Sequence, residues 1–209
     1  MVCVLLIVIA SVQASAGNNP AVKVAVHVLP HGQVSCASMP EISDCSDINH
    51  TYAGCGDIDV FPVFWGMTEY KAFEYSLIWP AEWGTCTFTS CSDLTIYQLD
   101  FYGDPETIDP GDLFSHAYFD CHPGDYVEIP GFGWLDASTP GRVCVDGAPP
   151  WTWPSPGSPL PAVLDCNQTV DQTICSFCAG VCGIPGHDVC ELPSSVEVIQ
   201  WGRIKAIFR

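Results

Sequence analysis

The stretch that decides the fold is Phe73-Glu-Tyr-Ser-Leu-Ile-Trp-Pro-Ala-Glu-Trp83. Its large apolar side chains stand at every second position, at Phe73, Tyr75, Leu77 and Trp79. Because successive side chains of a β-strand point to opposite faces, this period of two predicts a strand with one face in the core. The strand is expected to end before Pro80. We interpret it as the central strand of a β-sandwich.

Other short segments share this character. Residues 22–29 alternate strictly, with valines on one face and His27 on the other, where we expect it to reach the surface. Further strands are predicted at 58–65, 72–79, 94–102, 113–120, 126–129, 132–135 and 142–145, with Pro62 at an edge or a bulge. Turn clusters such as 109–112 and 122–125 separate them. About eight short strands favour an all-β, antiparallel β-sandwich over residues 17–147.

Residues 1–16 have the pattern of a secretory signal peptide. A short apolar run is followed by Ala14-Ser15-Ala16, a small-x-small pattern that predicts cleavage after Ala16. The run is shorter than the ~20 residues that a helix needs to cross a bilayer, so we expect no transmembrane segment. The predicted location is therefore secreted, extracellular or on the cell surface.

The chain has 13 cysteines, of which Cys3 is lost with the signal peptide. An even number of cysteines in an exported chain favours disulfides. The twelve candidates are Cys36, Cys45, Cys55, Cys86, Cys91, Cys121, Cys144, Cys166, Cys175, Cys178, Cys182 and Cys190. The segment between Cys86 and Cys91 is interpreted as a disulfide-closed turn. Zinc is an alternative for the last four thiols, which begin with a Cys-x-x-Cys pair.

The composition changes after residue 147. Residues 148–161 contain six prolines and predict a semi-rigid linker. Residues 162–193 contain five cysteines and predict a disulfide-rich appendage. Because five is odd, at least one bridge should tie this appendage to the sandwich if all twelve cysteines pair within the chain. Residues 194–209 form a basic, amphipathic C-terminal segment.

The charge balance is strongly acidic, with 24 Asp and Glu residues against 6 Lys and Arg residues. Such a surface repels phosphate backbones, so we expect no nucleic acid partner. It attracts divalent cations instead, and oxygen-rich turns offer ligands for calcium. These candidate calcium ligands are Asp57, Asp59, Asp104, Asp109 and Asp112. None has the spacing of an EF-hand, so no cofactor is predicted outright and calcium stays an open alternative.

Acids beside tryptophans form the candidate ligand site. Glu74 and Glu82 flank the end of the central strand, next to Trp83, and Trp151 and Trp153 lie in the proline-rich segment. A sugar-binding face presents such residues, while a glycoside hydrolase needs a pair of carboxylates. Acids on the outer face of a strand also occur without any such function. No catalytic residue is assigned, since no G-x-S-x-G motif of a serine hydrolase is present.

Several segments resemble a known class of domain. The stretch 73–83, Gly133-Trp-Leu-Asp136 and Thr139-Pro-Gly-Arg-Val-Cys-Val145 resemble cohesin-like and immunoglobulin-like sandwich domains of secreted bacterial proteins. The residues 164–190 and the end Trp201-Gly-Arg-Ile-Lys-Ala-Ile-Phe-Arg209 resemble uncharacterised exported proteins with a Trp-Gly-x-Ile-Lys-type end. The resemblance implies an extracellular sandwich and a C-terminal segment that contacts sorting machinery or the cell envelope. It implies no activity.

These observations predict a binding, adhesion or structural module rather than an enzyme. The expected partner is a glycan or another surface protein. Two alternatives stay open: an extracellular carbohydrate-active hydrolase that uses paired carboxylates, and a subunit of an extracellular fibre or surface layer.

Overall fold

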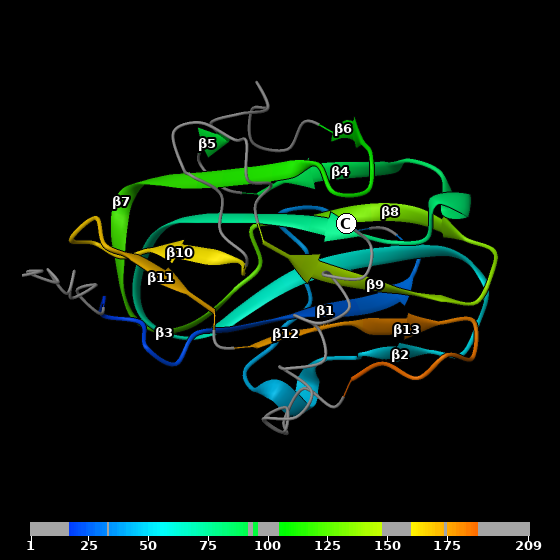
Figure 1. Cartoon of the computed structure of the whole chain (residues 1–209), viewed down its shortest axis with the longest axis horizontal. Helices are drawn as coiled ribbons and strands as arrows, with labels where there is room; N and C mark the ends of the chain where they lie inside the picture. Colours follow the sequence, from blue (N-terminus) through cyan, green and yellow to red (C-terminus); the bar gives the residue numbers. More distant parts are fainter. Residues whose placement is uncertain are drawn as a thin grey trace, which may run out of the picture.

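The computed structural model describes residues 17–32, 34–91, 94–95, 105–147, 160–173 and 175–187 (Figure 1). In these ranges the chain consists mostly of β-strands. Its helical elements there are two 3-10 turns, η1 Cys45–Asp47 and η2 Ala81–Trp83. No helix among the described residues is long and apolar enough to cross a membrane. The all-β prediction is confirmed.

The described residues form thirteen strands joined in one mixed sheet. In chain order they are β1 Lys23–Pro30, β2 Thr51–Tyr52, β3 Gly56–Ile78, β4 Cys86–Ser90, β5 Leu94–Thr95, β6 Pro105–Ile108, β7 Leu113–Glu128, β8 Gly131–Ala137, β9 Gly141–Asp146, β10 Ala162–Leu164, β11 Val170–Gln172, β12 Cys175–Phe177 and β13 Ala179–Val181. The expectation of a purely antiparallel sheet is wrong, because β1 pairs with β12 and β2 with β13 in parallel. Parallel pairs need long connections, which alternation within short segments does not reveal.

The long strand β3 organises the sheet. The separate strands predicted at 58–65 and 72–79 are its two halves. The first half pairs with β1 and β8, and the second with β7, β9 and β10. Between the halves, the register with β7 shifts three times and Gly66 has a φ of 75°. Bulges bend a strand and a positive φ suits glycine, so β3 and β7 turn together at the left of Figure 1.

Two predictions from the sequence concern the region of this bend. The strands predicted at 113–120 and 126–129 are one strand, β7, and the turn expected at 122–125 lies inside it. Pro62 was expected at an edge or a bulge, and the described strands give it a partner on one side only. It pairs with Val26 of β1 and falls between the stretch of β3 paired with β8 and the stretch paired with β7.

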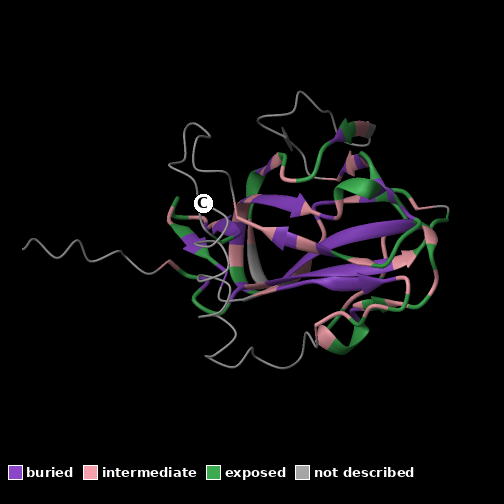
Figure 2. Cartoon of the chain, turned by 45° about the vertical axis from the view of Figure 1, so that its right-hand side comes forward, coloured by how far each residue is buried: buried purple, intermediate pink, exposed green. Residues whose placement is uncertain are grey.

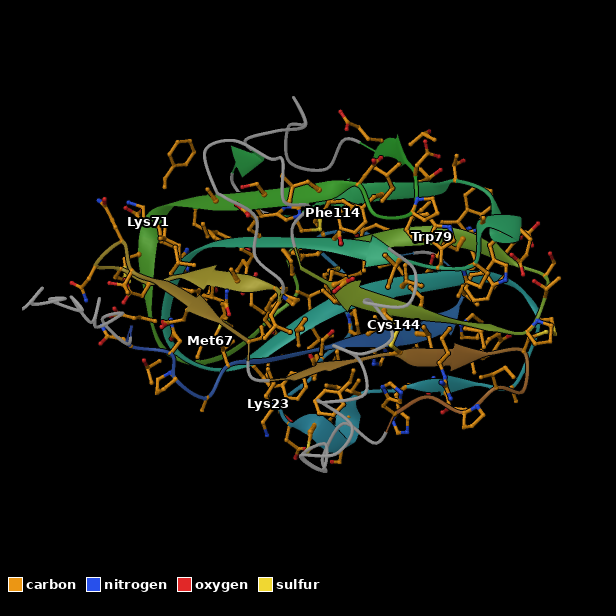
Figure 3. The ribbon with its side chains drawn as sticks, viewed as in Figure 1. Lys23, Met67, Lys71, Trp79, Phe114 and Cys144 are labelled. Carbon is orange, nitrogen blue, oxygen red and sulfur yellow. A yellow bond between two sulfur atoms is a disulfide. The ribbon has the colours of Figure 1, made fainter. Side chains whose placement is uncertain are left out.

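The bend encloses the main core. The ring of Phe64, on the first half of β3, lies 4.6 Å from that of Phe73 and 5.5 Å from that of Tyr75, both on the second half. Tyr75 stacks on Phe114 of β7 at 5.1 Å. Figure 2 shows buried residues along the inner strands, and Figure 3 shows where Phe114 and Trp79 lie. The period-two face of 73–79 is thus buried as predicted, and each such side chain contributes roughly 1.5–3 kcal/mol.

The other face of β1 is also covered, and the expectation that His27 reaches the surface is wrong. A second hydrophobic cluster with Ile48, Phe61 and Phe177 packs on this face. His27 is buried against Phe61, and its Nδ1 accepts the Asn49 N–H at 3.0 Å. Burial lowers the pKa of His27 to about 4. Alternation places a side chain on a face, but it does not show what covers that face.

The residues expected to form an appendage lie in the sheet. β10 pairs with β3, β12 with β1, and β13 with both β9 and β2. Three disulfides join this part to earlier strands and loops: Cys121–Cys166, Cys144–Cys178 and Cys55–Cys182. The expectation of at least one such bridge is confirmed. Residues 148–159 of the predicted linker and residues 188–209 lie outside the described ranges.

The remaining cysteines correct two expectations. Cys36 pairs with Cys91, and Cys45 is also disulfide-bonded. Cys86 is a free, buried thiol, so 86–90 form a strand rather than a disulfide-closed turn. Burial raises the pKa of this thiol to about 12. Because Cys178 and Cys182 are in different disulfides, the zinc alternative fails for these two. Cys190 lies outside the described residues.

Candidate functional site

An exposed indole lies on a strand that has a neighbouring strand on each side. Along β8 burial alternates, which turns Leu135 inward and Trp134 and Asp136 outward. Trp134 is 40% exposed, and its cross-strand neighbours are Asp59 of β3 and Thr87 of β4. The chain therefore presents a large aromatic side chain on a strand flanked on both sides, where most aromatic rings would be covered.

A histidine with a buried partner borders this indole. His31 follows β1, and its ring centroid lies 5.5 Å from that of Trp134, tilted by 40°. Its Nδ1 is 2.8 Å from Asp59 Oδ1, and Asp59 Oδ2 accepts the Gly32 N–H at 3.0 Å. The His31 side chain is 46% exposed, whereas that of Asp59 is 2% exposed. A buried carboxylate thus orients an accessible imidazole.

Two further carboxylates stand at the border of this surface. Asp57 of β3 and Asp136 of β8 are direct cross-strand partners, and both are exposed. Like charges in this arrangement repel each other. We call Trp134, His31, Asp59, Asp57 and Asp136 the Trp134 face. It offers an apolar ring surrounded by hydrogen-bonding groups, an arrangement that suits a ligand with one apolar face and a rim of hydroxyls.

The sequence pointed instead to the corner after the central strand. Trp83 is 3% exposed, and its Nε1 donates to the carbonyl oxygen of Thr139 at 3.0 Å and to its Oγ1 at 2.9 Å. Its indole therefore presents no surface to a ligand. Glu82 is exposed in η2, while Glu74 lies within β3 opposite Ser115 and Ala162. Trp151 and Trp153 lie outside the described residues.

No three of the predicted calcium ligands that the structure describes lie close enough together to hold a common ion. Asp59 is engaged by His31, and Asp112 Oδ2 accepts the N–H of Asp109 at 2.8 Å within an exposed turn. Asp104 lies outside the described residues. In the described ranges, one group of three metal-capable side chains is close enough for a common ion, namely Glu69 with Cys121 and Cys166. Those two cysteines form a disulfide, so they offer no thiolate.

A second histidine constellation is fully buried. His116 of β7 lies between two hydroxyls, with Tyr75 3.0 Å from its Nε2 and Ser90 3.2 Å from its Nδ1. Burial lowers the pKa of His116 to about 3. His116 is thus a core histidine whose two ring nitrogens both have hydrogen-bond partners. Since all three side chains are buried, this hydrogen-bonded chain meets no substrate.

A cavity of about 260 Å³ lies beside the Cys36–Cys91 disulfide, lined also by Met39, Pro40, Val127, Glu128 and Ile129. Its one ionisable side chain is already engaged. Glu128 accepts the hydroxyls of Tyr70 at 2.6 Å and Tyr118 at 2.7 Å. The cavity therefore offers fewer available polar groups than the Trp134 face.

Comparison with known proteins adds no further constraint, since neither a family model nor a curated protein matches the chain. The resemblance to cohesin-like and immunoglobulin-like domains stays a prediction. Of the Trp134 face, the sequence singled out only Asp57 and Asp59, as candidate calcium ligands, and did not connect them with Trp134 or His31. The period-two alternation of 132–135 already separates Trp134 from Leu135. Nothing in the sequence indicates that His31 and Asp59 adjoin this strand.

Proposed function

We propose that the protein is a secreted or cell-surface binding module without catalytic activity, built on a cohesin-like or immunoglobulin-like β-sandwich, and that it binds a glycan on the Trp134 face. The observation that carries this proposal is the exposed Trp134 indole, bordered by an imidazole that a buried carboxylate holds in place. The apolar face of a sugar ring would stack on the indole, and its hydroxyls would bond to His31, Asp57 and Asp136.

The extracellular location is supported by the disulfides. Four bridges between described residues span 34 to 127 residues of sequence, and such bonds persist in oxidising compartments. The predicted signal peptide is consistent with this extracellular location.

The open shape of the site sets the expected affinity. A single indole on a flat sheet surface buries only part of a ligand, whereas enclosed pockets bury most of it. We therefore expect dissociation constants of about 0.1–1 mM for short oligosaccharides, which corresponds to about 4–5.5 kcal/mol. Repeated sugar units or several copies of the module would raise the apparent affinity.

One observation keeps a hydrolase as the second candidate. Asp57 and Asp136 are directly opposite across β3 and β8, and such pairs have Cβ atoms about 4.5–5.5 Å apart. Retaining glycoside hydrolases hold their two carboxyl groups about 5–5.5 Å apart. Both aspartates are exposed, however, and a hydrolase needs one carboxyl group whose proton affinity is raised by an enclosed environment. Binding without turnover is therefore the better-supported function.

A glycan array, followed by an assay for reducing-sugar release on every glycan bound, separates the two candidates. The wild-type protein should bind a restricted set of glycans and release no sugar. Sugar release that is lost in Asp136→Asn would identify the hydrolase. No glycan binding above that of Trp134→Ala would overturn the proposal. Size-exclusion chromatography of the same sample tests the fibre alternative, which predicts assembly that increases with concentration.

A further inference from the structure

Gly17, the first residue that the structure describes, lies against a carboxylate. A Cβ atom at this position would come within 2.2 Å of Asp171 Oδ1 and 2.4 Å of its Oδ2. No side chain fits in this space unless Asp171 moves. The α-carbon of Gly17 is therefore held beside the carboxylate of a residue in β11.

Two carboxylates at this place are buried. Asp171 is 7% exposed and Asp165 is 1% exposed. Asp171 Oδ2 accepts the Asn19 N–H at 2.9 Å, and Asp165 Oδ2 accepts that of Asn18 at 3.2 Å. Asp165 Oδ1 also accepts the N–H groups of residues 167 and 169. Within the described ranges, no Lys, Arg or His forms an ion pair with either carboxylate. Backbone donors offset only part of the cost of burying such charges.

The segment that follows Gly17 is fixed in place. Asn19 is fully buried, and its Oδ1 accepts the backbone N–H of Thr68 at 2.9 Å and of Glu69 at 3.2 Å. Asn18 Nδ2 donates to Glu69 Oε1 at 2.6 Å. Chain ends usually fray unless such contacts hold them. Residues 17–19 are thus positioned as part of the folded domain.

We propose that cleavage between Ala16 and Gly17 completes this site, because the new ammonium group of Gly17 forms an ion pair with Asp171. In this hydrolysis the bond between the Ala16 carbonyl carbon and the Gly17 nitrogen breaks. Water supplies the hydroxyl of the new Ala16 carboxyl group and a hydrogen for the Gly17 amine. The amine takes up a further proton at neutral pH. Asp165 and Glu69 add to the negative field that this cation meets.

The geometry permits the pair with little movement. The nitrogen and the missing Cβ are both substituents of the same α-carbon. Once the bond to residue 16 is cut, the nitrogen can rotate about the Cα–C bond by about 120°, from one substituent position to the next. At the full 120° it would stand where a Cβ would be, 2.2 Å and 2.4 Å from the two Asp171 oxygens, so a smaller rotation brings it to the ~2.8 Å of a charge-assisted hydrogen bond. The precursor has an uncharged amide nitrogen here, so processing itself would stabilise the fold.

A pair of chains that differ by one residue tests this inference. One begins at Gly17 after removal of a tag by a protease that leaves glycine first, and the other begins at Ala16. Each is made with Asp171 and as Asp171→Asn, with disulfides intact. With Asp171, the Gly17 form should melt about 2–4 °C higher than the Ala16 form. In Asp171→Asn this difference should disappear. Equal melting temperatures with Asp171, or an unchanged difference in Asp171→Asn, would overturn the ion pair.

A second measurement needs no substitution at Asp171. An amine-acylating reagent is added to the folded and to the denatured Gly17 form, and the modified peptides are quantified by mass spectrometry. The amines of Lys23 and Lys71 serve as internal references (Figure 3). Folding should slow acylation of Gly17 several-fold relative to these lysines. Equal slowing of all three amines would contradict the proposal. Neither measurement depends on glycan binding, so the two proposals can fail separately.

Discussion

The two histidines His31 and His116 have similar neighbours and different settings. Each has a ring nitrogen within hydrogen-bond distance of an oxygen, and each lies beside an aromatic ring. His116 is fully buried between Tyr75 and Ser90, whereas nearly half of the His31 side chain is exposed. The same chemistry therefore forms part of the core in one place and of a surface in the other. Exposure, rather than residue type, therefore separates the structural network around His116 from the candidate site around His31.

The largest contrast between the two histidines should be in stability. His116→Ala leaves a cavity and removes the partner of two buried hydroxyls, so it should lower the free energy of unfolding by about 3–5 kcal/mol. His31→Ala should lower it by less, about 1–2 kcal/mol, since the imidazole is half exposed although the Asp59 carboxylate that it pairs with is buried. Denaturant titrations under non-reducing conditions measure both. Similar losses of stability in the two variants would contradict the assignment of His116 to the core and of His31 to the surface.

A second contrast concerns pH. Burial lowers the pKa of His116 to about 3 and of His27 to about 4, against about 6.5 in an unfolded chain. Below pH 6.5 the unfolded chain binds more protons at these sites, so stability is lost as pH falls toward these lowered values. For His27 the loss between pH 7 and pH 4 should be on the order of 2–3 kcal/mol.

Thermal melts of variants from pH 7 to pH 4 measure this effect. His27→Gln should have a flatter dependence of melting temperature on pH than the wild type. His31→Gln is the matched control, because it removes an exposed imidazole of the same type. If His27→Gln keeps the full wild-type slope, burial of His27 does not set the pH dependence.

A smaller effect on stability is expected at Asp59, the buried carboxylate that pairs with the half-exposed His31. Asp59→Asn preserves the shape but weakens the charge-assisted bond to His31, so stability should fall by about 1–2 kcal/mol. Glycan affinity should fall several-fold, because the imidazole loses its orientation. Asp57→Asn, on the exposed border of the same strand, is the control for the change of charge. Calorimetric titration measures the glycan affinity of both variants, and denaturant unfolding measures their stability. Equal losses in Asp59→Asn and Asp57→Asn would contradict a specific role for Asp59.

Much of this architecture could be predicted from local pattern. Alternation located the strands at 22–29 and 72–79, and it gave the inward face of Tyr75 and Leu77 correctly. The odd number of cysteines in 162–193 correctly indicated a bridge to the rest of the domain. These successes share a cause, because each depends on residues close in sequence or on simple counting.

The failures depend on contacts between distant segments. The sequence predicted separate strands at 58–65 and 72–79, yet bulges carry β3 through as one strand. Cys86 was expected to form a disulfide but is a free thiol in the core. Its sulfur lies so close to Gly133 that a Cβ atom at position 133 would come within 2.4 Å of it. Trp83 looked like a ligand residue and is buried. Trp134 drew no notice as a site because His31 and Asp59 adjoin it only in the fold.

The most direct test of the central claim is a calorimetric titration with the glycan that binds best on the array, using wild type, Trp134→Ala and Phe119→Ala. Phe119 is 73% exposed on β7 and serves as the matched control for loss of an exposed aromatic ring. We predict that Trp134→Ala lowers the affinity at least about tenfold, a loss of about 1.4 kcal/mol, with little change in stability. Phe119→Ala should bind like the wild type. Unchanged affinity in Trp134→Ala, or an equal loss in both variants, would contradict the assignment of the Trp134 face as the binding site.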